Sequence, residues 1–442
     1  MRMARAMYGS VTETDTSDDE RASRVERVLP QGVRKLCRVL ADNGHGAWVV
    51  GGCVRDVLMG REASDWDIAT SAQPEAVQKL FRRTIPTGIQ HGTVTVLIDR
   101  EQFEVTTLRG EAEYSDGRRP DHVFFVTSIE DDLGRRDFTV NAIAYDPVGR
   151  CLVDPWKGLS DLSEKVIRAV RDPMERFHED GLRVLRAARF VSSLEFALEP
   201  ATEAGIAPNL PTFAKVSPER IRDEWVKAFK AKSPSRAFEI MRRTGMLGVC
   251  CLPLHQLNDA TFARTMQRLD QAPRDVSDAS IREPFLARLG ALLWDVDAKA
   301  ADAWLDAMRY SKRDREAVQM THRVRTLEGE PTEMQLRKAA AAMKQDVQWL
   351  LDLFVLDASL RSDASALETR ERVLAVLDRG EAFTIKSLAL TGADVMSLSG
   401  KGPGRYVGVV LEKLLAIILE DPSQNQRETL ASHTQRMLRE VS

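Results

Sequence analysis

Two short stretches decide the fold of this chain: Gly51-Gly52-Cys53-Val54-Arg55-Asp56 and, one predicted helix further on, Asp65-Trp66-Asp67-Ile68-Ala69-Thr70. The first follows the apolar run 47–50, which predicts a buried strand, and leads into a helix predicted over 54–59. Glycines between a strand and a helix let the backbone approach a phosphate closely, and a helix N-terminus favours anions. A double glycine also occurs in plain tight turns, and without a following Gly-Lys-Ser/Thr it is not a P-loop.

The second stretch predicts two carboxylates on one face of a strand over 64–69. Side chains alternate along a strand, so Asp65 and Asp67 point the same way, ~7 Å apart, while Trp66 points into the core. Two neighbouring carboxylates repel each other, and a divalent metal is the natural reason to pair them. Glu104, on a later predicted strand, is a candidate third ligand, and three carboxylates can hold two magnesium ions roughly 4 Å apart. A solvated strand edge gives the same Asp-x-Asp pattern.

Around these stretches the chain changes character once, at about Asp161. Before that point helices and strands alternate; after it, 3.6-residue helical patterns take over. In the first part we expect helices over 34–43 and 74–82 and a hairpin with strands 92–98 and 102–108. In the second we expect one helix over 172–194, another starting at Ser217-Pro218, and an apolar helix over 407–419. The fold class is therefore α+β: a small N-terminal α/β head with a mixed sheet, followed by an all-helical remainder.

The bulk composition is that of a soluble globular chain with several domains. Its 442 residues exceed one ordinary domain, with 43% hydrophobic and 29% charged residues. No apolar run reaches the ~20 residues that span a bilayer. Residues 1–25 are polar and acidic, lack the apolar segment of a secretory signal, and are predicted to be a disordered lead-in. Five scattered cysteines fit a reduced, cytoplasmic setting, and a net charge of −3 gives no global signal for nucleic acid.

Four further blocks follow in order, and with the first two stretches they resemble the class II branch of the nucleotidyltransferase superfamily. That branch contains CCA-adding enzymes and bacterial poly(A) polymerases. The blocks, which resemble the family's ribose, hinge, nucleotide-template and neck motifs, are 135–142, 154–158, 179–183 and 219–224. The resemblance implies a catalytic head over 26–160, a nucleotide-selecting neck over 161–230, a helical body over 231–380 and a tRNA-binding tail over 381–442. It also implies addition of CCA to tRNA from CTP and ATP.

The same resemblance assigns the site residues. Asp65, Asp67 and Glu104 are the expected catalytic carboxylates, and the first two are the expected ligands of a two-ion Mg²⁺ site. The expected nucleotide-binding residues are Gly51, Gly52, Arg55, Arg136, Asp137, Asn141, Asp180, Arg183, Arg186 and Arg189. Among these, Arg136 and Asp137 are the expected ribose readers, although a charged pair beside a buried Phe also fits a helix start.

Asp180 and Arg183 are three residues apart on the predicted helix and so share a face. A surface ion pair has the same spacing. The resemblance implies that this pair replaces a nucleic-acid template, and hydrogen-bonding chemistry agrees. Asp180 would accept from the exocyclic amine of cytosine or adenine, and Arg183 would donate to cytosine N3 or adenine N1. Uracil and guanine offer the opposite groups, so one pair selects C and A with ~1–3 kcal/mol per contact.

Several alternatives to a full CCA-adding enzyme stay open. A poly(A) polymerase usually carries an arginine-rich strand before the third carboxylate and a basic C-terminal extension, and neither is present here. The segment 109–130 resembles the flexible loop that A addition needs, which argues against a CC-adding enzyme but not against an A-adding one. A plain surface loop is the other interpretation of that segment. The non-enzyme alternative, an inactive helical RNA-binding protein, is disfavoured because all three carboxylates are present.

tRNA is expected to be held by shape and phosphate contacts along the neck, body and tail. Candidate contacts are Arg309, Lys312, Arg313 and the start of the helix after Gly402-Pro403-Gly404. Charge runs of this kind are usually solvated faces, so no RNA-binding residue is assigned. No His-Asp dipeptide occurs among the seven histidines, which argues against a metal phosphohydrolase, and His91 is expected to be structural. The sequence indicates no membrane partner and no oligomeric state.

Overall fold

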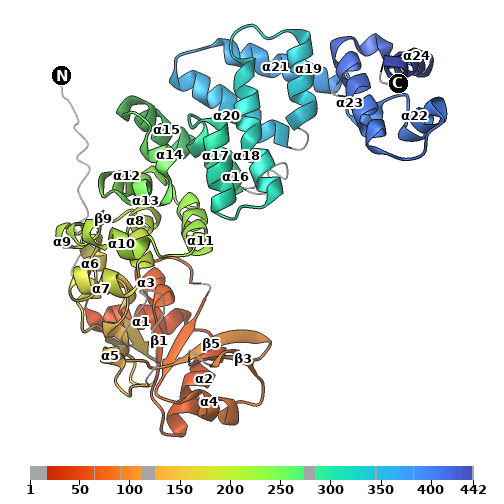
Figure 1. Ribbon diagram of the computed structural model, residues 1–442. Helices are drawn as coiled ribbons and strands as arrows, with labels where there is room; N and C mark the ends of the chain where they lie inside the picture. Colours follow the sequence, from red (N-terminus) through yellow and green to blue (C-terminus); the bar gives the residue numbers. More distant parts are fainter. Residues whose placement is uncertain are drawn as a thin grey trace, which may run out of the picture. The chain divides into compact units, whose positions relative to one another are not determined.

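The computed structural model describes residues 17–63, 65–89, 92–110, 125–272, 284–343, 346–381 and 383–440. The chain divides into two compact units. The N-terminal unit comprises Met1–Ser217 with Arg243–Val249, and the C-terminal unit comprises Pro218–Arg242 with Cys250–Ser442. Figure 1 shows that the large sheet belongs to the first unit and that the second is built from helices. The predicted α+β fold class is thereby confirmed, while the finer division into head, neck, body and tail stays a prediction.

A seven-stranded mixed sheet forms the centre of the N-terminal unit, in the order β3-β4-β5-β2-β1-β6-β7. The strands are β1 Ala47–Val50, β2 Asp67–Thr70, β3 Thr84–Gly88, β4 Thr93–Ile98, β5 Glu101–Thr107, β6 Ala144–Asp146 and β7 Cys151–Val153. Strand β2 pairs antiparallel with β1 and parallel with β5, with Ile68 opposite Val105. This register places the residues just before them, Asp67 and Glu104, side by side on adjacent strands.

The predicted hairpin is confirmed. Strands β4 and β5 pair antiparallel from Thr93 opposite Thr106 to Ile98 opposite Glu101. Two residues connect them, Asp99 and Arg100, with φ of 50° and 73°. Positive φ at both positions is the geometry that suits the twist of a two-residue hairpin.

Helices cover both faces of this sheet, so alternate residues of the central strands enter two separate cores. Val49 and Ile68 join one core, with Val33 and Leu36 from a helix, whereas Val50 belongs to the other. The helices of the first half are α1 Asp18–Val28, α2 Gln31–Asp42, α3 Gly52–Leu58, α4 Pro74–Leu80, α5 Ile129–Gly134 and α6 Gly158–Glu164.

The prediction of a disordered lead-in is wrong from Asp18 onward, because residues 18–28 form helix α1. Ser17 caps it by accepting a hydrogen bond from the Glu20 amide. The acidic run that suggested a solvated tail lies in the first helical turn, where negative charge is favourable. Ala22 and Val25 are buried and anchor the helix to the sheet core.

The single helix predicted over 172–194 is also wrong. It is two helices, α7 Pro173–Glu179 and α8 Leu182–Leu194, separated by Asp180 and Gly181. Asp180 is extended, with φ −141° and ψ 106°, and its carboxylate accepts from the Leu182 amide at 3.0 Å. A Cβ on Gly181 would lie 2.6 Å from the backbone of Phe213, so close packing requires glycine at this position, and the extended Asp180 before it ends helix α7.

Most of the remaining chain is helical, with one exception. Strands β8 Val166–Ile167 and β9 Ala197–Leu198 form a short parallel pair, so the remainder after Asp161 is not entirely helical. The other α-helices of the N-terminal unit are α9 Pro200–Ala204, α10 Leu210–Phe213 and α13 Met246–Cys250, whose last residue falls in the other unit.

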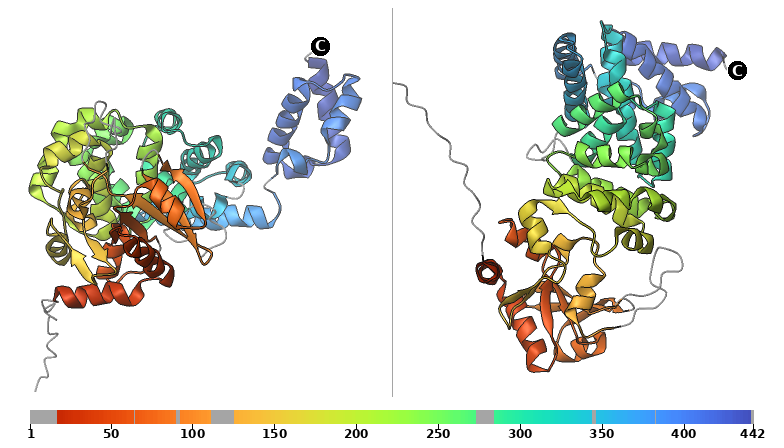
Figure 2. Two further views of the ribbon diagram at one scale, coloured as in Figure 1. Left: turned by 90° about the horizontal axis from the view of Figure 1, so that it is seen from below. Right: turned by 90° about the vertical axis from the view of Figure 1, so that its left-hand side faces the viewer.

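The C-terminal unit contains only helices among its described residues (Figure 2). They include the predicted helix after Pro218 and the apolar helix near the end, here α23, and none is long and apolar enough to cross a membrane. They are α11 Pro218–Phe229, α12 Ser235–Arg243 (whose last residue falls in the other unit), α14 Leu252–His255, α15 Asp259–Gln271, α16 Pro284–Leu293, α17 Ala298–Ala307, α18 Lys312–Val324, α19 Glu333–Met343, α20 Val347–Leu360, α21 Ser365–Asp378, α22 Gly392–Ser399, α23 Arg405–Glu420 and α24 Arg427–Glu440.

Candidate functional site

A pocket of about 340 Å³ lies over the β1, β2 and β5 region of the sheet. Its charged lining consists of Asp67, Glu104, Arg109, Asp132, Arg135 and Arg136. Carboxylates from strands β2 and β5 and from helix α5, and guanidinium groups that follow β5 and α5, therefore line one cavity. Such a pocket is suited to a ligand that carries both metal-bound and free phosphate oxygens.

The acidic side of the pocket is held by the sheet register. Asp67 is the first residue of β2, and Glu104 lies beside it on β5. Burial raises the pKa of Asp67 to about 6, and the nearby Glu104 adds to the rise while Arg136 opposes it. The Asp67 side chain reaches solvent, but protein atoms around its carboxylate limit hydration. The pairing of β2 with β5 confirms that Glu104 lies on a neighbouring strand, while its role as a third ligand stays a prediction.

Asp65 does not lie on the strand, so that part of the prediction is wrong. Strand β1 ends at Val50, which pairs with Asp67, and the chain then turns at Gly51, so residues 65 and 66 have no partner on the β1 side. Asp65 is exposed just before β2, close enough to raise the pKa of Asp67 slightly. Within the described ranges, no three Asp, Glu, His or Cys side chains form a ready-made metal site.

The basic side of the pocket is organised by Asp132, which is 2% exposed. Its Oδ1 accepts from Arg135 Nε at 2.9 Å and Nη2 at 2.6 Å, and its Oδ2 accepts from Arg136 Nη2 at 3.2 Å. The backbone amide of Arg109 also donates to Oδ1, at 3.3 Å. Burial alone would raise the pKa of Asp132, but the two guanidinium groups hold it below its ordinary value.

Gly51 packs closely against the guanidinium group of Arg136. Its φ of 81° and ψ of −134° favour glycine, and an added Cβ would lie 3.0 Å from Arg136 Nη1. Gly52 begins helix α3, and Arg55 on that helix is buried. Arg55 donates to the Asn141 side-chain oxygen at 2.5 Å and to the Asp56 carboxylate at 2.9 and 3.0 Å.

A second group of predicted residues forms a buried network behind the pocket. Asp137 accepts from the Phe138 amide at 2.8 Å, from Asn141 at 3.0 Å and from Arg186 Nε at 2.7 Å. Burial opposes its ionisation, but Arg186 and these hydrogen bonds hold the pKa of Asp137 well below its usual range. Because its carboxylate is filled by protein donors, Asp137 joins helix α8 to the ribose block.

Three predicted arginines surround one aromatic ring on helix α8. The guanidinium carbons of Arg55, Arg186 and Arg189 lie 5.4, 5.3 and 3.6 Å from the centre of Phe190. Cations over a ring face are attracted by its quadrupole, so Phe190 holds these side chains together.

The predicted template pair is separated by the break between α7 and α8. Arg183 donates to the Arg176 carbonyl at 2.9 Å, to Glu179 at 2.5 Å and to the Arg135 carbonyl at 3.0 Å. Asp180 accepts from the Leu182 amide instead of sharing a helix face with Arg183. The expectation of a common helix face is therefore wrong, because the extended backbone of Asp180 interrupts the helix.

Sequence reasoning missed three residues that line the pocket: Arg109, Asp132 and Arg135. Arg135 begins the ribose block, and Asp132 lies three residues before it, so an acidic residue one helical turn from an Arg-Arg pair was the available signal. Most of the predicted loop over 109–130 lies outside the described residues, as does His91.

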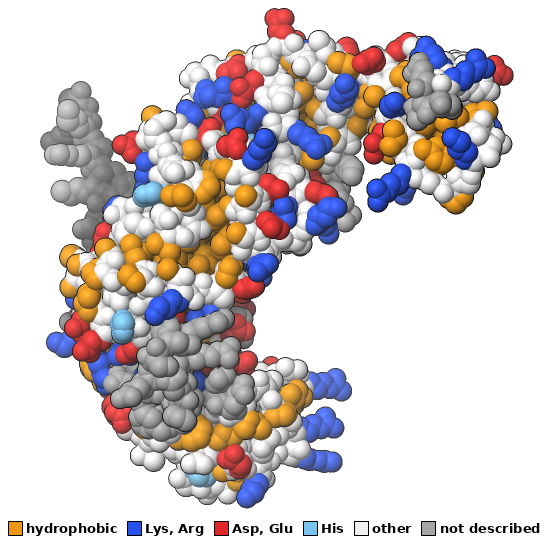
Figure 3. Space-filling model, in the orientation of Figure 1, with side chains coloured by type: hydrophobic (Ala, Val, Ile, Leu, Met, Phe, Trp, Pro, Cys, Tyr) orange, Lys and Arg blue, Asp and Glu red, His pale blue; other side chains and the backbone are white. Residues whose placement is uncertain are grey.

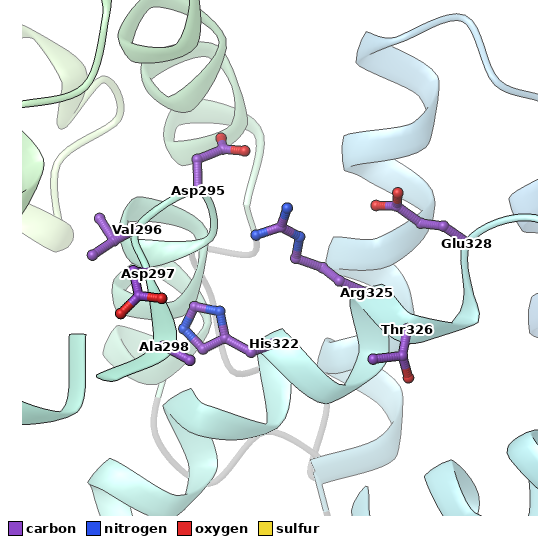
Figure 4. Close-up of a pocket in the computed structure, with 8 residues that line it drawn as sticks. All are labelled: Asp295, Val296, Asp297, Ala298, His322, Arg325, Thr326 and Glu328. Atoms are coloured by element: carbon purple, nitrogen blue, oxygen red, sulfur yellow. The ribbon is translucent and has the colours of Figure 1, made fainter. Parts of the chain in front are cut away.

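The C-terminal unit has its own pocket, of about 470 Å³, that contains none of the predicted site residues (Figure 4). Arg325 points toward Asp295 there, and His322 lies beside Asp297. Burial lowers the pKa of His322, and Arg325 lowers it further. Most of these charges have protein partners, because Asp295 pairs with Arg268 and Arg325 donates to the Trp294 carbonyl.

The candidate RNA contacts also lie in the C-terminal unit. Lys312 forms an ion pair with Glu316 at 3.8 Å, and the Arg309 carbonyl accepts from Arg222. On the face shown in Figure 3, basic and acidic side chains are interspersed over these helices. This mixture agrees with a net charge of −3.

Comparisons with known proteins place this pocket in a family. The family described as "Poly A polymerase head domain" matches residues 47–168, which contain the pocket. The one described as "Probable RNA and SrmB- binding site of polymerase A" matches residues 195–253.

Curated relatives carry the name CCA-adding enzyme. The protein from Bacillus licheniformis is 35% identical over 414 residues, covering 89% of this chain and 95% of that protein. The one from Lactobacillus johnsonii is 52% identical over 211 residues, covering 48% of this chain and 53% of that protein. The chain thus spans about half the length of this second relative. The crystal structure of the Bacillus stearothermophilus CCA-adding enzyme in complex with CTP matches with a TM-score of 0.70 and 30% identity, covering 93% of this chain and 98% of that one.

Proposed function

This chain belongs to the family of CCA-adding enzymes, and we propose that it adds the 3′-terminal CCA sequence to tRNA from CTP and ATP. The observation that carries the proposal is the pocket that combines Asp67 and Glu104 with Arg109, Arg135 and Arg136. A nucleoside triphosphate needs cationic groups for its phosphates and metal-holding carboxylates at the reacting phosphorus. Because tRNA is the proposed substrate, we assign the activity to the cytoplasm.

Asp67 and Glu104, with Asp65 beside them, are the residues proposed to hold Mg²⁺. Carboxylate oxygens are the ligands that this cation prefers, and the pKa of Asp67 is raised by burial and then by the negative charge of Glu104, which a cation would offset. When bound, Mg²⁺ would activate the attacking tRNA hydroxyl and neutralise charge on the triphosphate.

The arginines of the pocket are proposed to bind and orient the triphosphate. Guanidinium groups match phosphate oxygens in a fixed fork, so Arg136 and its neighbours would hold the leaving pyrophosphate in line with the attacking hydroxyl. Arg55, Asp137, Asn141 and Arg186 would act behind them by fixing helix α8 against the ribose block.

Base choice is proposed to rest with Asp180 and Arg183. Arg183 would have to exchange some of its contacts with Arg176, Glu179 and Arg135 for a base, and Asp180 would have to release the Leu182 amide. Since Asp180 already lies at a break between helices, such a movement needs no unwinding of a continuous helix.

The proposal is tested with three tRNA transcripts that end before CCA, after C and after CC. Each is incubated with labelled CTP, ATP or both, with and without Mg²⁺. Addition of C, C and A in order to the first transcript supports full CCA addition. Extension only of the third would indicate an A-adding enzyme, extension that stops after CC a CC-adding enzyme, and long A tracts a poly(A) polymerase. Absence of incorporation with all three would leave an inactive RNA-binding protein.

A further inference from the structure

We propose that Asp132 is a positioning residue that aims Arg135 and Arg136 at the phosphates of the incoming nucleotide. The inference rests on the proposed function, because it names a residue that prepares the same pocket for a triphosphate. Asp132 itself would not touch the reacting atoms. It would act through the two guanidinium groups that its carboxylate holds.

The geometry around Asp132 is that of a hub. Its two carboxylate oxygens accept from Arg135, from Arg136 and from the backbone amide of Arg109. All four residues line the pocket that contains Asp67 and Glu104. The buried carboxylate of Asp132 therefore holds the side chains of Arg135 and Arg136. Through the Arg109 amide, it also ties them to the segment that follows strand β5.

Arg136 has unused hydrogen-bonding capacity. Its Nη2 donates to Asp132, but its buried Nε has no hydrogen-bond partner among the described residues. A buried donor without an acceptor costs free energy unless a ligand supplies the acceptor. Gly51 leaves room beside Nη1 of the same guanidinium, so an anion can approach it. The phosphate oxygens of a nucleotide are acceptors of the required charge.

The net charge around Asp132 also favours a role in phosphate binding over a purely structural contact. Asp132 carries one negative charge against two guanidinium groups, so the cluster of three side chains keeps an excess positive charge. Arg136 and Asp67 line the same pocket, and the ion pair with Asp132 gives Arg136 a partner other than the Asp67 carboxylate. Holding Arg136 on Asp132 thus keeps it available for phosphate and keeps Asp67 available for a cation.

The test compares Asp132→Asn with Asp131→Asn. Both residues are in helix α5, but Asp131 is exposed and lies outside the pocket, so its substitution is the matched control. Binding of cytidine, CMP, CDP and CTP is measured for each variant by calorimetry, and KM and kcat are measured with tRNA that lacks CCA. Asp132→Asn should weaken CTP binding and raise the KM by roughly 10- to 100-fold, because misplaced positioning groups have effects of this size. Cytidine binding should change less than twofold, and the loss should grow with each phosphate.

Three outcomes overturn the inference. Equal loss for cytidine and CTP would show a general structural role, unchanged KM would show no role, and a kcat loss alone would place Asp132 in the chemistry. If Asp132→Asn does not fold, Asp132→Glu keeps the charge and displaces it by one methylene, and it must still show the phosphate-dependent loss. A wild-type protein that binds CTP but incorporates nothing would refute the proposed function. The calorimetric series from cytidine to CTP would then still test the role of Asp132.

Discussion

Two carboxylates of the N-terminal unit, Asp67 and Asp137, lie in opposite environments. Asp67 has another acid beside it, and its pKa is raised to about 6. Asp137 accepts from Phe138, Asn141 and Arg186, and its pKa is lowered. The first arrangement is unfavourable without a ligand, whereas the second is complete within the protein. This difference in environment distinguishes residues proposed to bind a substrate or cation, such as Asp67, from residues that stabilise the site, such as Asp137.

The largest effect is expected where the carboxylate lacks a protein partner. Asp67→Ala should reduce incorporation by roughly 10³-fold or more, since metal-assisted stabilisation is worth several kcal/mol. The measurement is labelled CTP incorporation at saturating Mg²⁺. Glu104→Gln should behave similarly, while Glu101→Gln on the same strand, outside the pocket, should retain activity. Comparable activity of all these variants would refute the assignment of the acidic side.

Removing the paired carboxylate should act mainly on stability. Asp137→Asn leaves Arg186 without its buried counter-charge, so the free energy of unfolding should fall by about 3 kcal/mol. Because the pKa of Asp137 is lowered on folding, this stabilisation is present above the unfolded pKa and is lost as pH falls through the lower folded value. Urea titrations of the variant and wild type at pH 7 and pH 4 measure both parts. An unchanged midpoint at pH 7 would mean that the network contributes nothing.

These two carboxylates also show what could be predicted from sequence. Strand alternation and a family motif both point to Asp67, and Glu104 is a candidate because it lies on a later predicted strand; the parallel pairing of β2 with β5 confirms their proximity. The partners of Asp137 were not predictable, because Arg186 lies 49 residues away on another helix. Local patterns carry no information on such pairings, which only the packing of α8 determines.

The errors have equally local causes. The apolar period over 172–194 is continuous and predicts one helix, but Asp180 is extended and Gly181 packs against the backbone of Thr212 and Phe213, which are distant in sequence. Asp65 was placed on a strand because alternation extends to it, but β1 ends at Val50 and offers no partner. Asp132 was missed because a residue in an acidic helical turn resembles solvated surface until its burial is known.

A smaller effect is expected for the template pair, Asp180 and Arg183, because both residues already have protein partners and are also proposed to contact the base. Asp180→Ala should lose discrimination against UTP and GTP, and Arg183→Ala should raise the KM for CTP and ATP together. The expected size is ~1–3 kcal/mol per contact, or roughly 5- to 150-fold. Incorporation of all four nucleotides by each variant is the measurement. Strict C and A preference in both variants would show that the contacts of Arg183 with Glu179 and Arg135 are its whole role.

The smallest effect is expected on the melting temperature, where Asp67 and Asp137 should have opposite influences on stability. The pKa of Asp67 is higher in the folded protein than its ordinary value near 3.8, so folding favours its protonated form. As pH rises from about 4 to about 6, the folded state therefore loses stability relative to the unfolded state. Asn does not ionise, so Asp67→Asn should melt higher than wild type above pH 6, by roughly 1 to 3 °C because solvent screens an accessible carboxylate.

The same melting curves include their own control. At about pH 3 the two proteins should melt together, because this pH lies below the ordinary carboxyl pKa of 3.8 and Asp67 is then largely protonated in both states. Mg²⁺ should raise the melting temperature of wild type at pH 7 and leave Asp67→Asn nearly unchanged, since the cation needs the carboxylate charge. Asp137→Asn must shift in the opposite direction at pH 7, because there the lost charge was paired with Arg186. If both substitutions lower the melting temperature at pH 7, Asp67 is a structural acid like Asp137, and the distinction between the two carboxylates fails.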